Sequence, residues 1–331
     1  GDLEIMIESL NSLIKNIKIL LMIVPALIGT LNVPGGAILS APMVEESGKR
    51  IKMDMETINA INLFFRHVGF FIYPLYSTLI LMSELLEIEV LTIIKYNFII
   101  MLVGLISAYV VLFRNQGNDE IPEVEMNGVK ESIINFFISF LPVFVILVLA
   151  LIFDVPFHYA VITGVLVGIV KNKTDGPLIK GLYNKIKKFI FKGVDYQLVF
   201  TIAGLMAFKA VVEKSGFVDN IAEVIIRLGV PLPLLVTGLG LIAGYITGLH
   251  VAAAGMLVPL FAPMIAESSI PVYAALIFTT INIGYVISPL HLCMILGNQY
   301  FDVSIKSVYR KLVIPLSLMI CVALLQLWIF T

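Results

Sequence analysis

The chain has 331 residues, of which 59% are hydrophobic and 14% charged, and its net charge is −1. A soluble domain of this length does not need so much apolar surface, and a nearly neutral chain offers no basic surface for nucleic acid. Apolar runs of about 20 residues, long enough to cross a bilayer, recur along the chain, so the composition predicts an all-α polytopic membrane protein.

The first part of the chain, residues 1–113, is predicted to form one structural repeat. Residues 16–48 contain two apolar stretches separated by "LNVPGG", which predicts a re-entrant hairpin because these residues are poor helix formers. Residues 55–87 form one apolar segment that "YPLY" interrupts, which predicts a broken helix, and residues 91–113 form a plain span.

A polar linker at 114–131 leads to a second predicted repeat at 132–331. Its expected elements are scaffold spans at 132–170, a basic helix at 178–193, a span at 195–213, a hairpin at 231–266, a broken helix at 270–297 and a span at 307–330. The basic helix carries too much charge to cross a bilayer, so it is expected to lie in the membrane interface.

The interruptions in the two repeats match one another. With Thr30 placed on Thr247, an offset of 217, and with a two-residue gap further on, the helix-breaking residues coincide. These pairs are Pro42 with Pro259, Gly69 with Gly284 and Pro74 with Pro289. Interrupted segments at corresponding places of two halves point to the binding site of a transporter.

The positive charges predict the orientation of the two repeats. If the first hairpin is re-entrant, about 17 Lys and Arg residues lie on its side of the membrane and 3 on the other side. Because cytoplasmic loops carry the excess of Lys and Arg, the first hairpin and the basic segment 171–193 are expected on the cytoplasmic side of a prokaryotic inner membrane, with the C-terminus outside. The second hairpin then enters from outside, so the repeats are predicted to be inverted.

Broken helices and hairpin tips at membrane depth are tolerated where protein buries them or where they line a wet cavity. The second helix of each hairpin begins at the tip, where its free N–H groups favour an anion. Backbone carbonyls freed at Pro74 and Pro289 can hold a cation such as Na⁺. The candidate substrate-binding residues are Asn32, Pro34, Gly35, Gly36, Arg66, His67, Thr247, Gly248, His250, Asn282 and His291. The candidate ion-coupling residues are Asn32, Ser40, Asn62, Thr247, Thr279, Thr280 and Ser288.

Each of these polar residues also has a purely structural interpretation, such as a turn cap, a back-bonded hydroxyl or a packed histidine. Arg66 is the most informative of them, since it stands eleven residues into the segment that begins near Met55. That position is about 16 Å deep, where an arginine costs at least about 2.5 kcal/mol, so its side chain must face protein or water. It either pairs with Glu45, Glu46 or hairpin carbonyls, or recognises a substrate carboxylate.

Enzymatic activity is not predicted, and no catalytic residue is proposed. The sequence contains no HExxH, Gly-x-Ser-x-Gly or Walker motif and no acidic pair within a span. The two cysteines, Cys293 and Cys321, lie far apart in apolar segments, so they are expected to form neither a disulfide framework nor a metal site. No cofactor or metal beyond a coupling Na⁺ or H⁺ is expected.

Four segments resemble a family of bacterial and archaeal membrane proteins, the domain of unknown function 401 family. These segments are "PALIGTLNVPGGAILSAPMVEESGKR", "INLFFRHVGFFIYPLYSTLIL", "FKAVVEKSG" and "GYITGLHVAAAGMLVPLFAPMI". The resemblance implies the ion-transporter superfamily, with relatives among sodium–dicarboxylate symporters and the large subunits of tripartite carboxylate transporters. It also implies inverted repeats, elevator movement and a homodimer, and it implies that the N-terminal scaffold helices of the first repeat are missing from this chain.

The function expected from these observations is secondary active transport of a small organic anion, a carboxylate, coupled to Na⁺ or H⁺. An ion channel, or a membrane subunit of a multi-component uptake system, is the alternative. The expected partners are therefore the anionic solute, the lipid bilayer and a second copy of the chain.

Overall fold

The computed structural model describes residues 16–30, 36–114, 157–171 and 229–330, together with scattered positions between 134 and 156 and between 187 and 211. The chain divides into two compact units: Gly1–Lys15 with Glu120–Val199, and Asn16–Asp119 with Phe200–Thr331. The first unit contains helix α8 (Phe157–Lys171). The second unit contains the other helices named below and all the described candidate site residues.

The described residues form helices and no β-strand, which confirms the all-α prediction. Three of these helical segments are long and apolar enough to cross a membrane. They are α6 (Val90–Phe113), Glu267–Val286, which joins η5 (Glu267–Ser269) to α14 (Ile270–Val286), and α16 (Ile305–Phe330). These segments agree with a membrane protein.

The first set of helices begins with the pair α2 (Ile17–Thr30) and α3 (Ala37–Arg50). Helix α4 (Met55–Val68) starts after Asp54, whose carboxylate accepts a hydrogen bond from the Thr57 N–H at 2.8 Å and caps the helix. A 3₁₀ turn, η1 (Gly69–Phe71), and Pro74 end this helix, and α5 (Ser77–Leu86) follows. Pro74 disfavours helical backbone at the residue before it, which explains the break.

The second set of helices repeats this order. It contains α12 (Leu232–Thr247), α13 (His250–Phe261), η4 (Ala262–Met264), η5, α14, α15 (Leu292–Phe301) and α16. Between α14 and α15 the chain leaves the helix at Pro289 and re-enters it after His291, which stands at the N-cap of α15. The two sets therefore share the same interruption by a proline.

The helix starts of the two sets differ by a constant number of residues. Helices α2, α4, α5 and α6 start at 17, 55, 77 and 90, and α12, α14, α15 and α16 start at 232, 270, 292 and 305, each 215 later. The helices α5 and α15 also end alike, on Glu87 (φ 57°) and Asp302 (φ 51°), which are again 215 apart. Left-handed backbone is uncommon outside glycine, so this shared ending is specific.

Glycine contacts place the two hairpins in the same register. A Cβ at Gly29 would overlap the carbonyl oxygen of Arg66, and a Cβ at Gly244 would overlap that of Ile281. Both glycines and both carbonyls are 215 residues apart. The offset of 217 inferred for the first hairpin helix from Thr30 and Thr247 is therefore wrong by two residues, because apolar helices offer few identities to fix a register, whereas backbone contact fixes it.

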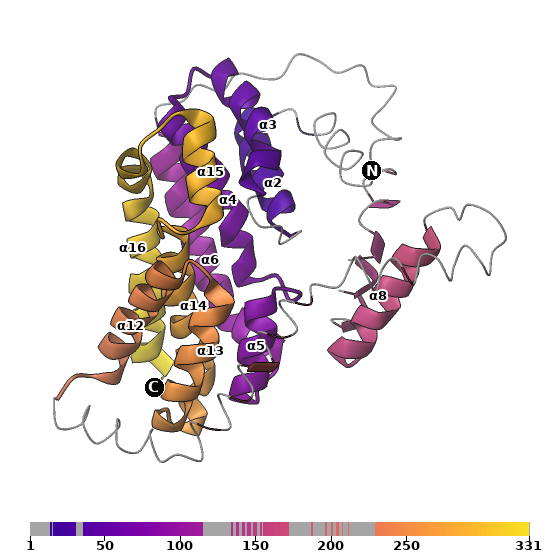
Figure 1. The fold of residues 1–331 in the computed structure, drawn as a ribbon, viewed down its shortest axis with the longest axis vertical. Helices are drawn as coiled ribbons and strands as arrows, with labels where there is room; N and C mark the ends of the chain where they lie inside the picture. Colours follow the sequence, from indigo (N-terminus) through magenta and orange to yellow (C-terminus); the bar gives the residue numbers. More distant parts are fainter. Residues whose placement is uncertain are drawn as a thin grey trace. The chain divides into compact units, whose positions relative to one another are not determined.

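Each set packs against the other. Helix α3 packs against α15, and α13 packs against α5, so the second helix of each pair contacts the helix that follows the break in the other set. Helices α6 and α16 pack side by side, with Gly104 against the Met319 side chain, and these two residues are themselves 215 apart. Figure 1 shows the pair α2–α3 and the pair α12–α13 towards opposite ends of this unit.

Candidate functional site

Three of the four histidines of the chain lie together at the helix interruptions. His67 is near the end of α4, His291 precedes α15, and His250 is the first residue of α13. Their side chains are buried, with exposed fractions of 2%, 1% and 6%. The ring centroids of His67 and His291 are 4.7 Å apart, and Tyr285 lies between the other pair, 4.7 Å from His250 and 3.9 Å from His291.

Aromatic rings extend this group into one buried cluster. Phe70 stacks on Tyr76 at 4.1 Å, Tyr76 lies 4.7 Å from His250, and Phe70 contacts His67 edge-on at 5.1 Å. We call the whole group the histidine–tyrosine cluster; it consists of His67, Phe70, Tyr76, His250, Tyr285 and His291. The cluster collects residues from both helix breaks and from the tip of the second hairpin.

Hydrogen bonds fix the orientation of the three imidazoles. His67 Nδ1 lies 2.6 Å from the Leu63 carbonyl oxygen, and His291 Nδ1 lies 3.3 Å from that of Val286. Since a carbonyl only accepts, each of these rings carries its proton on Nδ1 and a lone pair on Nε2. The Nε2 atom of His291 is buried and has no hydrogen-bond partner among the described residues. His250 Nδ1 pairs with Thr78 Oγ1 at 2.5 Å.

Arg66 places a positive charge one residue before His67. Its side chain is 2% exposed, and a Cβ at Gly36 would overlap its guanidinium group. The absence of a side chain at Gly36 therefore makes room for the guanidinium at the start of α3. Glu45 and Glu46, considered above as its partners, form ion pairs with Lys49 and Arg50, both at 2.6 Å.

The tip of the second hairpin touches the second helix break. Gly248 ends α12 with a φ of 56°, and a Cβ there would overlap Leu290, the residue after Pro289. Thr247 donates its hydroxyl proton to the Ala243 carbonyl at 2.7 Å, and Ser288 donates to the Tyr245 carbonyl at 2.6 Å. These two hydroxyl groups therefore hold the hairpin and the break in place and keep oxygen lone pairs for a cation.

Asn282 lies beside the histidine–tyrosine cluster on α14. It is 2% exposed, and its Nδ2 has no hydrogen-bond partner among the described residues. Asn282 and His67 line one small cavity together with Phe64, Phe71 and Met319. His67 and Asn282 are also 215 residues apart, so equivalent positions of the two helix sets face the same cavity.

The remaining ion-coupling candidates are engaged in local hydrogen bonds. Ser40 Oγ donates to Asn62 Oδ1 at 2.6 Å, and Asn62 Nδ2 donates to the Ala37 carbonyl at 2.9 Å, which ties α3 to α4. Thr279 and Thr280 donate to carbonyls one turn back in α14, at 2.7 and 2.9 Å. Three predicted site residues at the first hairpin tip, Asn32, Pro34 and Gly35, lie outside the described residues.

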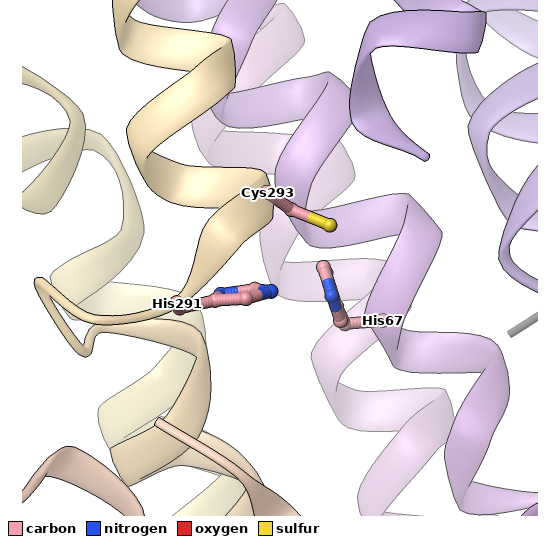
Figure 2. Close-up of side chains that lie close together, drawn as sticks. All are labelled: His67, His291 and Cys293. Atoms are coloured by element: carbon pink, nitrogen blue, oxygen red, sulfur yellow. The ribbon is translucent and has the colours of Figure 1, made fainter. Parts of the chain in front are cut away.

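Two residues of this region, Tyr285 and Cys293, were not predicted from the sequence. Cys293 lies in the first turn of α15, 3% exposed, and its sulfur and one ring nitrogen each of His67 and His291 all lie within 4.8 Å of one another (Figure 2). The "HLC" spacing at 291–293 was a visible signal, but the partner His67 is distant in the sequence. The expectation that Cys293 has no metal-ligating neighbours is therefore wrong.

The helical fold, the apolar spans and the polar cluster buried among them define an integral membrane protein with an internal polar site. The chain belongs to the family described as "Protein of unknown function (DUF401)", whose model matches residues 1–330. This match confirms the family resemblance stated from the sequence. A search of curated proteins finds no match to this chain.

Proposed function

We propose that this protein is a secondary active transporter that moves a small organic anion, a carboxylate, across the cytoplasmic membrane in exchange for the energy of a cation gradient. The observation that carries the proposal is the buried convergence of one arginine and three histidines at two helix breaks and a hairpin tip. Ionisable side chains inside a membrane protein are costly, so their concentration at such breaks favours a solute or ion pathway.

The charge of this region favours an anion. Arg66 is buried, whereas every described Asp and Glu side chain is at least partly exposed. A planar guanidinium matches a carboxylate with two parallel hydrogen bonds, which a lysine cannot provide. Gly36 beside this guanidinium would allow a bound anion to reach both the arginine and the N–H groups at the start of α3.

The two helix sets support alternating access. Matching helix starts, matching left-handed ends and the reciprocal packing of α3 on α15 and α13 on α5 are the features expected of two intertwined repeats. With the distribution of Lys and Arg, they favour repeats of inverted topology. The elevator movement, the homodimer and the inner-membrane location are proposed from the resemblance to the ion-transporter superfamily.

For the coupling ion we favour H⁺ over Na⁺. Three neutral imidazoles lie within one cluster, and His291 has a buried Nε2 lone pair that can accept a proton. A proton taken up there would offset the negative charge of the bound carboxylate. Hydroxyl oxygens at Thr247 and Ser288 are the alternative, Na⁺-binding groups.

The test is a thermal-stability screen of the purified full chain with panels of carboxylates and inorganic oxyanions, each in matched sodium and potassium buffers. A ligand that binds the folded protein raises its melting temperature, so a carboxylate is expected to stabilise it, and equally in both buffers if H⁺ is used. Stabilisation in sodium alone would replace H⁺ by Na⁺. The absence of any stabilising anion would contradict the proposal.

Transport itself is measured in proteoliposomes with the anion found in the screen. A transporter gives saturable uptake that internal unlabelled anion accelerates, and an H⁺-coupled one gives uptake driven by an inward proton gradient. Single-channel conductance would instead support the channel alternative. Uptake that appears only after addition of a soluble binding protein would support the multi-component alternative.

A further inference from the structure

The side chains of His67, His291 and Cys293 converge on one buried space. His67 belongs to α4, whereas His291 and Cys293 stand at the start of α15, on the other side of the second helix break. Their exposed fractions are 2%, 1% and 3%, and their ligand atoms lie within 4.8 Å of one another. Figure 2 shows the His291 ring and the Cys293 sulfur directed towards His67.

These donor atoms suit a particular class of metal ion. Imidazole nitrogen and thiolate sulfur are preferred by Zn²⁺ and Cu⁺, whereas Na⁺, Mg²⁺ and Ca²⁺ prefer oxygen. In a tetrahedral site with bonds of about 2.0 to 2.3 Å, the ligand atoms are about 3.5 Å apart. The three side chains therefore need to approach one another by only about 1 Å.

The surroundings of the two imidazoles have the form of a metal site. The Nδ1–H groups of His67 and His291 point at backbone carbonyl oxygens, those of Leu63 and Val286. A carbonyl in this position fixes the tautomer and directs the Nε2 lone pair at a metal. The Nε2 atom of His291 is buried without a hydrogen-bond partner among the described residues, so a bound ion would satisfy an otherwise unmade interaction.

We propose that His67, His291 and Cys293 form a binding site for a transition-metal ion of the Zn²⁺ or Cu⁺ class. On binding, the Cys293 thiol releases its proton to solvent and the thiolate sulfur bonds to the metal, while both imidazoles bind as neutral ligands. Three protein ligands leave the fourth position of a tetrahedral ion to water or to an anion. The ion would join α4 to the start of α15 and so hold two parts of the helix bundle together. This inference does not depend on the transport proposal.

The experiment is a titration of the purified, chelator-treated full chain with Zn²⁺ alone in competition with a chromophoric chelator. The wild type is expected to bind one ion per chain and to gain melting temperature on binding. Cys293→Ser and His291→Gln are expected to weaken Zn²⁺ at least about 100-fold, because loss of a direct ligand exceeds the 10–100-fold effect of an outer hydrogen bond. The matched controls are Cys321→Ser, at the exposed cysteine, and His158→Gln, in α8, and both are expected to retain wild-type affinity.

Co²⁺ provides a second readout that needs no variant. A thiolate-to-cobalt charge-transfer band in the wild type, absent in Cys293→Ser and present in Cys321→Ser, would support the proposal. Equal Zn²⁺ affinity in the wild type and Cys293→Ser, no Zn²⁺ binding by the wild type, or a Co²⁺ spectrum without the thiolate band would overturn it. If His291→Gln does not fold, the nearly isosteric Cys293→Ser and the wild-type spectrum still decide the question.

Discussion

The helices between Ile17 and Phe113 and those between Leu232 and Phe330 share their starts and their breaks but bury different side chains. Helix α4 buries polar and charged groups, and the positions 215 residues later in α14 bury mostly apolar ones. The pairs are Asn59 and Ala274, Asn62 and Ile277, Arg66 and Ile281, and His67 and Asn282. The backbone plan is repeated, whereas the chemistry is not.

This difference separates what shapes the fold from what equips the site. Helix boundaries are set by prolines, glycines and caps, which the two halves have in common. The buried polar positions are not needed for those boundaries, so each half can carry its own groups: the arginine in the first, and two of the three clustered histidines in the second.

The largest expected effect concerns the feature that the halves share. Gly29→Ala and Gly244→Ala should each lower the free energy of unfolding by about 3 kcal/mol, because the added Cβ overlaps a backbone carbonyl that cannot move aside. The measurement is the unfolding of each variant in detergent. Gly238→Ala in α12 is the control, since a Cβ there meets nothing within 4 Å, and it should be neutral or slightly stabilising. A control as unstable as Gly244→Ala would contradict the shared register.

The next effect tests a polar contact found in the first half alone. Asn62→Ala removes the acceptor of Ser40 and the donor to the Ala37 carbonyl, and leaving them unsatisfied should cost about 2 kcal/mol. Thr279→Val in α14 is the matched substitution in the other half and should cost much less, because Thr279 bonds only within its own helix. Equal losses of stability would mean that the Ser40–Asn62 pair does not tie α3 to α4.

Arg66→Lys tests whether the charge of the first half reads the substrate. It keeps the charge and loses the paired geometry, so the variant should fold yet bind the anion identified by the stability screen at least tenfold more weakly, about 1.4 kcal/mol. Arg50→Lys, at the exposed end of α3, should bind it like the wild type. Unchanged affinity in a stable Arg66→Lys variant would exclude recognition, and a variant that fails to fold would assign Arg66 a structural role.

The smallest effect compares the caps of the two broken helices. Asp54→Ala should destabilise by about 1 kcal/mol, whereas Ser269→Ala, 215 residues later, should change little, because Ser269 makes no side-chain cap hydrogen bond to α14. Burial raises the pKa of Asp54, but hydrogen bonds from Thr57 and Lys311 outweigh it and hold this pKa below its usual value. The folded-state pKa is then lower than the unfolded-state one.

The stabilisation by Asp54 is consequently complete above its unfolded-state pKa of about 3.9 and disappears as the pH falls through the folded-state pKa. Unfolding measured between about pH 6 and pH 3 should show this loss in the wild type and in Ser269→Ala. Asp54→Asn should lack it. An identical pH dependence in Asp54→Asn would assign the acid sensitivity to other carboxylates.

Local features of the sequence were sufficient to predict the class of fold and the helix breaks. Hydropathy predicts helices of membrane length, and Gly69, Pro74 and Pro289 predict the interruptions, because backbone restrictions act within a few residues. The same reasoning selected Arg66, His67, His250 and His291, since ionisable groups near breaks in apolar segments are rare.

Tertiary packing decided the rest. The register of the two hairpins followed from glycines that touch backbone carbonyls, and not from residue identities among apolar helices. The meeting of Cys293 with His67, and the hydrogen bonds that hold Ser40, Asn62 and Ser288, depend on how helices distant in the chain cross one another. The sequence by itself determined where the helices start and stop, because caps and prolines act on neighbouring residues. Only the folded structure decided which side chains meet, because those contacts depend on helix packing over long separations in sequence.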